Sequence, residues 1–228
     1  MNMSKKYELI VFDWDGTLMD SEARIVTCMQ RAATDAGFPM PADAAARDII
    51  GLGMQEAVER LFPGADAKGV DALIDAYRGH WLGNRVEAAT MFSGARELVS
   101  GLRQSGHLLA VATGKSRRGL DQALGETGLG DFFHATRCAD ETFSKPHPQM
   151  LQEILTDLDM SPAAAVVIGD TEYDMQMASS ARVDAVGVSH GVHSTERLLA
   201  QGALRCFDDL HQLSGWLQRS SISSEREA

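Results

Sequence analysis

The sequence predicts an α/β protein whose doubly wound, mostly parallel sheet carries an inserted all-α segment. From residue 92 onward, short apolar runs alternate with helical patterns, as expected for a parallel sheet covered by helices on both faces. Between residues 20 and 87, apolar residues recur at helical spacing and no strand is expected. Three of the expected strands also end in polar residues, and ligands of doubly wound sheets bind at that edge.

The first expected element is a strand over residues 9–12, a continuous apolar run that stops at Asp13. Asp15 follows two positions later, and Gly16 favours a backbone turn. Two carboxylates at the end of a buried strand lose hydration, and they repel each other unless a cation or a shared proton lies between them. The pattern indicates a divalent-metal site beside a nucleophilic carboxylate. A turn closed by an Asx cap is the structural alternative.

Residues 20–87 are expected to form a helical insertion. Asp20 and Ser21 can cap a first helix that ends near Gly37. Apolar spacing marks three further helices, at about residues 42–50, 54–62 and 73–81, and the segment Gly-Leu-Gly at 51–53 separates the first two of them. We expect residues 1–19 and 88–218 to form the core, 20–87 the insertion and 219–228 a polar tail.

Strands and helices alternate over the rest of the chain. Ser93 can cap a helix that ends near Gly106. Further strands are expected over residues 108–112, 132–138, 164–168, 183–188 and 204–207. Helices are expected after the strand that ends at 112, at about 149–158, after Asp170 and over 208–217. This order predicts the doubly wound sheet.

Composition restricts the possible functions. The chain has 228 residues, 44% of them hydrophobic and 23% charged, with a net charge of −11, which argues against a nucleic-acid or anionic-membrane surface. Three widely spaced cysteines, Cys28, Cys138 and Cys206, match neither a disulfide framework nor a metal knuckle. We identify no signal peptide and no transmembrane span. A cytoplasmic enzyme, monomer or homodimer, with a small-molecule partner is expected.

Polar residues at the ends of three strands are expected to converge. The three predicted strands end in polar residues: Asp13 and Asp15 after the first, Thr113 and Lys115 after the second, and Asp170 after the third. Lys145 lies in a Lys-Pro-x-Pro loop that can reach the same edge. Gly114-Lys115-Ser116 also resembles the end of a Walker A loop, but that motif needs glycine where this chain has Leu109. Nucleoside triphosphate binding by that route is disfavoured.

These residues resemble the four motifs of the haloacid dehalogenase-like hydrolases. Asp-x-Asp-Gly-Thr-Leu at 13–18 resembles the first motif, Thr113 the second, Lys145 the third and Gly-Asp-Thr-x-x-Asp at 169–174 the fourth, in the family's order. The helical insertion looks like the family's α-helical cap. The chain is similar to the subgroup of phosphoglycolate phosphatases and β-phosphoglucomutases.

The resemblance implies a catalytic and metal-binding role for three aspartates. Asp13 would attack phosphorus and become an aspartyl phosphate. Asp15 would protonate the leaving alcohol and then activate the hydrolytic water. Asp13, Asp170 and the backbone carbonyl of Asp15 would hold Mg²⁺, which prefers a few oxygen ligands together with water and substrate phosphate.

The remaining motif residues would bind phosphate or support its ligands. Thr113 and the Gly114 amide would cradle the phosphate near a helix N-terminus. Lys145 would pair with both phosphate and Asp13, and Asp174 would orient Lys145 or a metal-bound water. By themselves, Thr113 is equally consistent with a strand-end cap, Lys145 with a solvated loop lysine and Asp174 with an exposed acid at a helix start.

Asp15 distinguishes between activities within this family. Haloacid dehalogenases resemble the chain but lack an acid there, whereas an alcohol leaving group needs a proton. We therefore expect a Mg²⁺-dependent phosphatase of a small phosphorylated metabolite, phosphoglycolate-like or a sugar phosphate. The alternatives are a β-phosphoglucomutase-like mutase and a catalytically idle binding module. Arg47, Arg60 and Arg85 are candidates for a second anionic group of the substrate, although each more often stays solvated.

Overall fold

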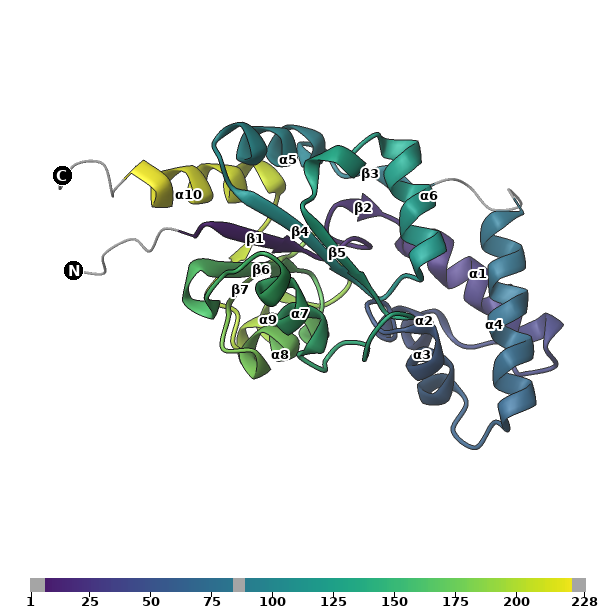
Figure 1. Ribbon diagram of the computed structural model, residues 1–228. Helices are drawn as coiled ribbons and strands as arrows, with labels where there is room; N and C mark the ends of the chain where they lie inside the picture. The colour runs from purple at the N-terminus through teal and green to yellow at the C-terminus, as the bar shows by residue number, and fades with distance from the viewer. Residues whose placement is uncertain (1–6, 84–88, 223–228) are drawn as a thin grey trace.

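A six-stranded sheet forms the centre of the computed structural model, which describes residues 7–83 and 89–222 (Figure 1). Its strand order is β5-β4-β1-β6-β7-β8, and all neighbouring strands are parallel. The strands are β1 (Leu9–Phe12), β4 (Leu108–Thr113), β5 (Ala135–Cys138), β6 (Ala165–Gly169), β7 (Asp184–Val188) and β8 (Cys206–Phe207). The chain starts in the middle of the sheet and winds outward in both directions, so the predicted doubly wound architecture is confirmed.

Helices cover both faces of this sheet. One layer holds α5 (Ala95–Gln104), α6 (Arg117–Thr127) and α10 (Leu210–Ile222), and the other holds α7 (Gln149–Asp157), α8 (Glu172–Ser180) and α9 (Thr195–Ala200). Alternate residues of β1 supply the two cores: Ile10 packs in the first layer and Val11 in the second, both fully buried. A strand buried on both faces explains the continuous apolar run in the sequence.

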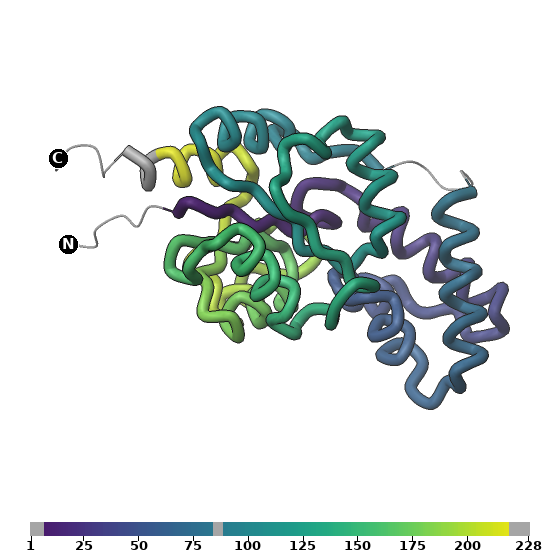
Figure 2. Tube along the Cα trace, in the orientation of Figure 1, coloured from purple at the N-terminus to yellow at the C-terminus, as the bar shows by residue number. Residues whose placement is uncertain are grey.

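The part of the inserted segment that the structure describes contains four helices with a hydrophobic core of their own. They are α1 (Glu22–Asp35), α2 (Asp43–Asp48), α3 (Met54–Leu61) and α4 (Ala67–Leu82), and Met29, Val58 and Leu73 are fully buried among them. The helices lie beyond the ends toward which β1 and β4 point (Figure 1; Figure 2 shows the same trace as a tube). No helix among the described residues is long and apolar enough to cross a membrane.

The structure corrects several sequence predictions. An antiparallel ribbon of β2 (Met19–Asp20) and β3 (Thr90–Met91) joins the insertion to the core, and strands of two residues leave no periodic pattern to detect. The helix α9 and the 3₁₀ turns η1 (Gly130–Phe132) and η2 (Pro162–Ala164) were not predicted. Gly94, with φ of +81°, is the N-cap of α5 in place of Ser93.

The structure changes the start of the predicted tail and does not describe the predicted end of the insertion. Helix α10 continues past the expected end at residue 217 to Ile222, so the first part of the predicted polar tail is helical. Residues 223–228 lie outside the described residues, as do residues 84–88, where the predicted boundary between insertion and core falls.

Candidate active site

The carboxyl ends of β1, β4 and β6 bring the motif residues together. These strands are neighbours, with Phe12 in register with both Val111 and Ile168, so Asp13, Thr113 and Asp170 lie at the same edge of the sheet. All three are almost completely buried. The turn after β1 brings Gly16 so close to Asp170 that a Cβ there would lie 2.2 Å from its Oδ2, and φ of +86° also favours glycine.

Lys145 lies beneath this edge as a buried cation. Its ammonium is 2.5 Å from Oδ1 of Asp13 and 2.6 Å from Oδ1 of Asp174. Burial acts to lower the pKa of Lys145, but the charges of Asp13 and Asp174 raise it above its ordinary value. Lys145 therefore stays charged at neutral pH and fixes the position of Asp13.

Asp174 occupies the N3 position of α8 and serves two purposes. Its Oδ2 accepts hydrogen bonds from the hydroxyl and backbone amide of Thr171, at 2.6 and 3.2 Å, which closes a capping box. Its Oδ1 pairs with Lys145. Asp174 therefore caps the start of α8 and also contacts Lys145. Its side chain is fully buried rather than exposed.

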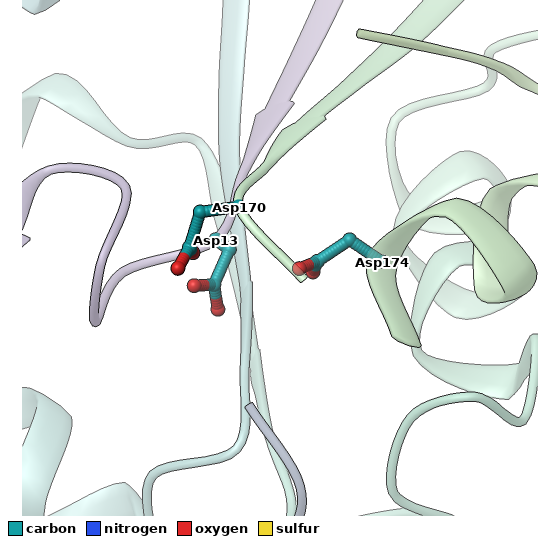
Figure 3. A group of neighbouring side chains, drawn as sticks. All are labelled: Asp13, Asp170 and Asp174. Carbon is teal, nitrogen blue, oxygen red and sulfur yellow. The ribbon is translucent and has the colours of Figure 1, made fainter. Parts of the chain in front are cut away.

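A group of three carboxylates satisfies the chemical requirements of a hard cation. Oxygen atoms of Asp13, Asp170 and Asp174 all lie within 4.8 Å of one another (Figure 3). Asp170 accepts hydrogen bonds from the Thr17 hydroxyl at 2.9 Å and the Val192 amide at 2.8 Å. Among the described residues, no basic side chain pairs with Asp170.

The negative charges of these buried carboxylates repel one another, which favours the binding of a further cation. Burial raises the pKa of Asp13 to about 7, although Lys145 acts to lower it. Burial, followed by the charge of Asp13, raises the pKa of Asp170 well above its ordinary value. A divalent cation at Asp13 and Asp170 would offset this repulsion, and carboxylate oxygens suit Mg²⁺.

Asp15 is held by Lys115, which the sequence placed at this edge without a role, and by Ser21, which it interpreted as a helix cap. Both of its carboxylate oxygens accept hydrogen bonds from the Lys115 ammonium at 3.0 Å, and the Ser21 hydroxyl donates to Oδ1 at 2.7 Å. Ser21 occupies the N-cap of α1 but makes no capping hydrogen bond with its side chain. Lys115 follows Thr113 in the loop after β4, so the sequence predicted its place at this edge but not its contact with Asp15.

The loop after β4 meets the insertion at very short distance. A Cβ on Gly114 would lie 2.4 Å from the carbonyl oxygen of Leu52, so only glycine fits there. The amide of Gly53 donates to the Ser144 hydroxyl at 2.6 Å. The segment 51–53 therefore faces the core. Thr113 accepts a hydrogen bond from the Lys115 amide at 3.2 Å.

Comparison with known proteins assigns the family. The family model described as "Haloacid dehalogenase-like hydrolase" matches residues 10–188. The chain belongs to this family. The predicted family is therefore confirmed, as is the prediction of an enzyme of the hydrolase class.

Individual relatives of this hydrolase cover most of its length. It is 32% identical over 197 residues to "Probable phosphatase IndB" of Dickeya dadantii, with 84% of the chain and 85% of the relative covered. It is 29% identical over 217 residues to "Phosphoglycolate phosphatase" of Pseudomonas putida, with 90% and 78% covered. A crystal structure of a predicted phosphatase from Clostridium acetobutylicum shares the fold at a TM-score of 0.85 and 24% identity, over 94% of this chain and 100% of that one.

A cavity of about 750 Å³ opens above the motif residues of this hydrolase. Asp13, Asp15, Thr113 and Gly114 line it from the core, and residues of α1, α3 and α4 line it from the insertion. Lys145, Asp170 and Asp174 are not part of the lining; they are buried and lie close to Asp13.

Two of the three candidate arginines for substrate binding, Arg47 and Arg60, do not line the cavity. Arg47 pairs with Glu22 at 2.6 Å and Arg60 with Asp48 at 3.1 Å, and both side chains are exposed. Neither lines the cavity. Arg85 lies outside the described residues. The solvated interpretation therefore holds for Arg47 and Arg60.

Proposed function

We propose that the protein is a Mg²⁺-dependent phosphatase that hydrolyses a small phosphorylated metabolite through an aspartyl-phosphate intermediate. The observation that carries this proposal is the placement of Asp13 and Asp15 in one cavity with different partners: Asp13 contacts Lys145 and Asp15 contacts Lys115. Two carboxylates in different surroundings suit two roles, a nucleophile and an acid–base. The phosphatase names of relatives with 85% and 78% of their length aligned support the assignment.

The reaction would proceed in two displacements. In the first, an oxygen of Asp13 forms a bond to phosphorus while the ester oxygen leaves, and Asp15 gives that oxygen a proton. In the second, Asp15 takes a proton from water, the water oxygen bonds to phosphorus, and the bond to Asp13 breaks. Free alcohol, inorganic phosphate and the starting enzyme result.

The proposed metal ligands are Asp13, Asp170 and the backbone carbonyl of Asp15. Mg²⁺ would neutralise negative charge where the phosphoryl group binds. Lys145 would keep Asp13 ionised and in place, which the 2.5 Å contact supports. Thr113 and the Gly114 amide are the proposed phosphate cradle.

Residues 20–87 are proposed as a cap over a core of residues 1–19 and 88–218. The separate hydrophobic core of α1–α4 supports this division, as does the close contact of the segment 51–53 with Gly114 and Ser144. A cap that closes over the site excludes water and lets the insertion select the substrate.

The test is phosphate release from a broad panel of phosphorylated metabolites with Mg²⁺, using wild type, Asp13→Asn and Asp15→Asn. Asp131→Asn is the matched control, because Asp131 is exposed on η1. We expect Asp13→Asn and Asp15→Asn to lose about a thousandfold or more in turnover, while Asp131→Asn keeps the wild-type rate.

Other outcomes would assign other functions. Near-normal activity of Asp13→Asn would exclude the covalent mechanism. Conversion of a sugar phosphate without net phosphate release, stimulated by a bisphosphorylated sugar, would identify a mutase. No turnover over the whole panel would favour a binding module.

A further inference from the structure

The cavity is much larger than a phosphoryl group with a two-carbon acid requires. Its volume of about 750 Å³ falls in the range of pockets that hold drug-sized ligands, about 300–1,000 Å³. It extends without interruption from Asp13 and Asp15 to the helices of the insertion. The space beyond the phosphoryl site is therefore available to the alcohol part of the substrate.

The insertion side of this space is predominantly apolar. The residues that line it there and are at least partly buried include Ile25, Met29, Leu52, Ile74, Tyr77 and Trp81. Tyr77 and Trp81 stack on each other with ring centroids 6.1 Å apart. Burial raises the pKa of Tyr77 well above its ordinary value, so its hydroxyl is neutral. A polyhydroxylated sugar against such walls would leave hydroxyl groups unpaired, which is costly.

Charged residues line the insertion side only where they are exposed. Glu56, Asp71 and Asp75 are acidic, and the one described cation on this side, Arg78, pairs with Asp75 at 3.1 Å. On the core side, Lys115 is engaged by Asp15.

The distribution of charge disfavours a second anionic group on the substrate. A carboxylate in the cavity would face an insertion wall with more acids than cations, which opposes its binding. The remaining cation of the lining, Arg118, is exposed on α6. It belongs to the core and does not change the charge of the insertion wall.

We infer that the substrate is the phosphate monoester of an alcohol whose body is uncharged and largely apolar, such as an aromatic ring on a short chain. This inference rests on the proposed phosphatase function and narrows its substrate class. It replaces a phosphorylated small acid or sugar as the preferred substrate. The phosphoryl group lies at Asp13, and the apolar body lies against the residues of α1 and α4 that line the cavity.

The test compares kcat/KM for four esters of primary alcohols: ethyl phosphate, 2-phenylethyl phosphate, phosphoglycolate and glucose 6-phosphate. The reacting bond is of the same type in all four, so differences report on the body of the alcohol. We expect 2-phenylethyl phosphate to exceed ethyl phosphate by about a hundredfold or more, since one methylene in an apolar pocket already discriminates about 10–200-fold. Phosphoglycolate and glucose 6-phosphate should fall below it.

A variant pair on one helix tests the location. Ile74→Asn places an amide in the cavity wall and should reduce the preference for the phenyl ester at least about tenfold. Ala72→Asn makes the same polar change on the exposed face of α4, away from the cavity, and should leave the preference intact. Thermal unfolding of both variants shows whether the insertion stays folded. The comparison of the four esters with the wild-type protein does not depend on the folding of these variants.

Different results would overturn the proposed phosphatase function and the inferred substrate class. If ethyl phosphate is cleaved and phosphoglycolate or glucose 6-phosphate equals or exceeds the phenyl ester, the phosphatase function stands and the substrate inference is overturned. If none of the four esters is hydrolysed in the presence of Mg²⁺, the substrate inference is overturned, and the broad panel of phosphorylated metabolites decides the phosphatase function separately.

Discussion

The ammonium of Lys115 lies 3.0 Å from each carboxylate oxygen of Asp15, although one hundred positions separate the two residues in the chain. The same ammonium lies 4.3 Å from the ring centroid of Trp81 on α4. Lys115 thus links the proposed acid–base to both β4 and the insertion. The contact of Lys115 with Trp81 thus fixes the orientation of the Asp15 carboxylate where the insertion meets the core.

Replacing Lys115 by methionine should lower turnover by about 10–100-fold. A positioned acid–base contributes about 10²–10⁴-fold, and loss of its orienting partner removes part of that effect. Asp15→Asn should therefore lose more activity than Lys115→Met, and Lys115→Arg should recover part of the loss. Steady-state kinetics with a saturating phosphate ester give kcat and KM separately, and the effect should fall on kcat.

Lys68→Met is the matched control for this series, because Lys68 is exposed on α4 and does not line the cavity. It should behave as wild type. A kcat for Lys115→Met that equals that of the control would rule out the positioning role.

Lys145→Met should strongly destabilise the fold. The side chain is fully buried and compensates Asp13 and Asp174, so its removal leaves two buried carboxylates without a cation. Breaking a buried ion pair in this way costs about 3–5 kcal/mol. Urea unfolding at neutral pH without Mg²⁺ measures the loss, and the double variant Lys145→Met/Asp13→Asn should recover part of it. No recovery in the double variant would mean that the loss comes from packing instead.

Mg²⁺ should stabilise the protein through Asp170. A ligand that binds only the folded state adds about 2.7 kcal/mol at a hundred times its dissociation constant, which for a chain of this size raises Tm by about 5–10 °C. Asp170→Asn should abolish this response, while Asp131→Asn should retain it. Differential scanning calorimetry with and without Mg²⁺ makes the comparison. An equal response in Asp170→Asn would place the cation elsewhere.

The fold could be predicted from the sequence because its strands are buried on both faces. The run from Leu9 to Phe12 is apolar at every position and corresponds to β1 without any shift. Elements without periodicity were missed, such as the ribbon of β2 and β3, whose strands have two residues each. Ser21 looked like a helix cap because serine favours that position, but its hydroxyl forms a tertiary contact with Asp15 instead.

The candidate site was predictable to the extent that strand order brings residues together. Asp13, Thr113 and Asp170 end neighbouring strands, and the direction of each strand implies their proximity. Lys115 lies in the loop after β4, yet its partner depends on the length and direction of one flexible side chain. Sequence spacing does not contain that information. The closure of Gly51 and Leu52 over Gly114 likewise depends on how two separate hydrophobic cores meet.

Arg197 of α9 links the insertion to the core and gives the protein a pH-dependent contribution to stability. Its guanidinium donates to Oδ1 of Asp48 at 2.5 Å and to both carboxylate oxygens of Glu172 at 2.8 and 2.6 Å. These bonds with Arg197 lower the pKa of Glu172 from its ordinary value of 4.5. A carboxyl whose pKa is lower in the folded state stabilises the fold above its ordinary pKa and loses this contribution as pH falls.

Glu172→Gln should therefore be less stable than wild type at about pH 7, and the difference should shrink as the pH falls toward about 3. Glu172 is partly exposed, so solvent screening keeps the effect modest. Urea unfolding of both proteins across this pH range measures the difference. Glu8→Gln is the control, because Glu8 is exposed and no partner of its side chain is described. A difference that stays constant with pH would show that the charge of Glu172 does not contribute, and that only its shape and its hydrogen-bonding oxygens matter to Arg197.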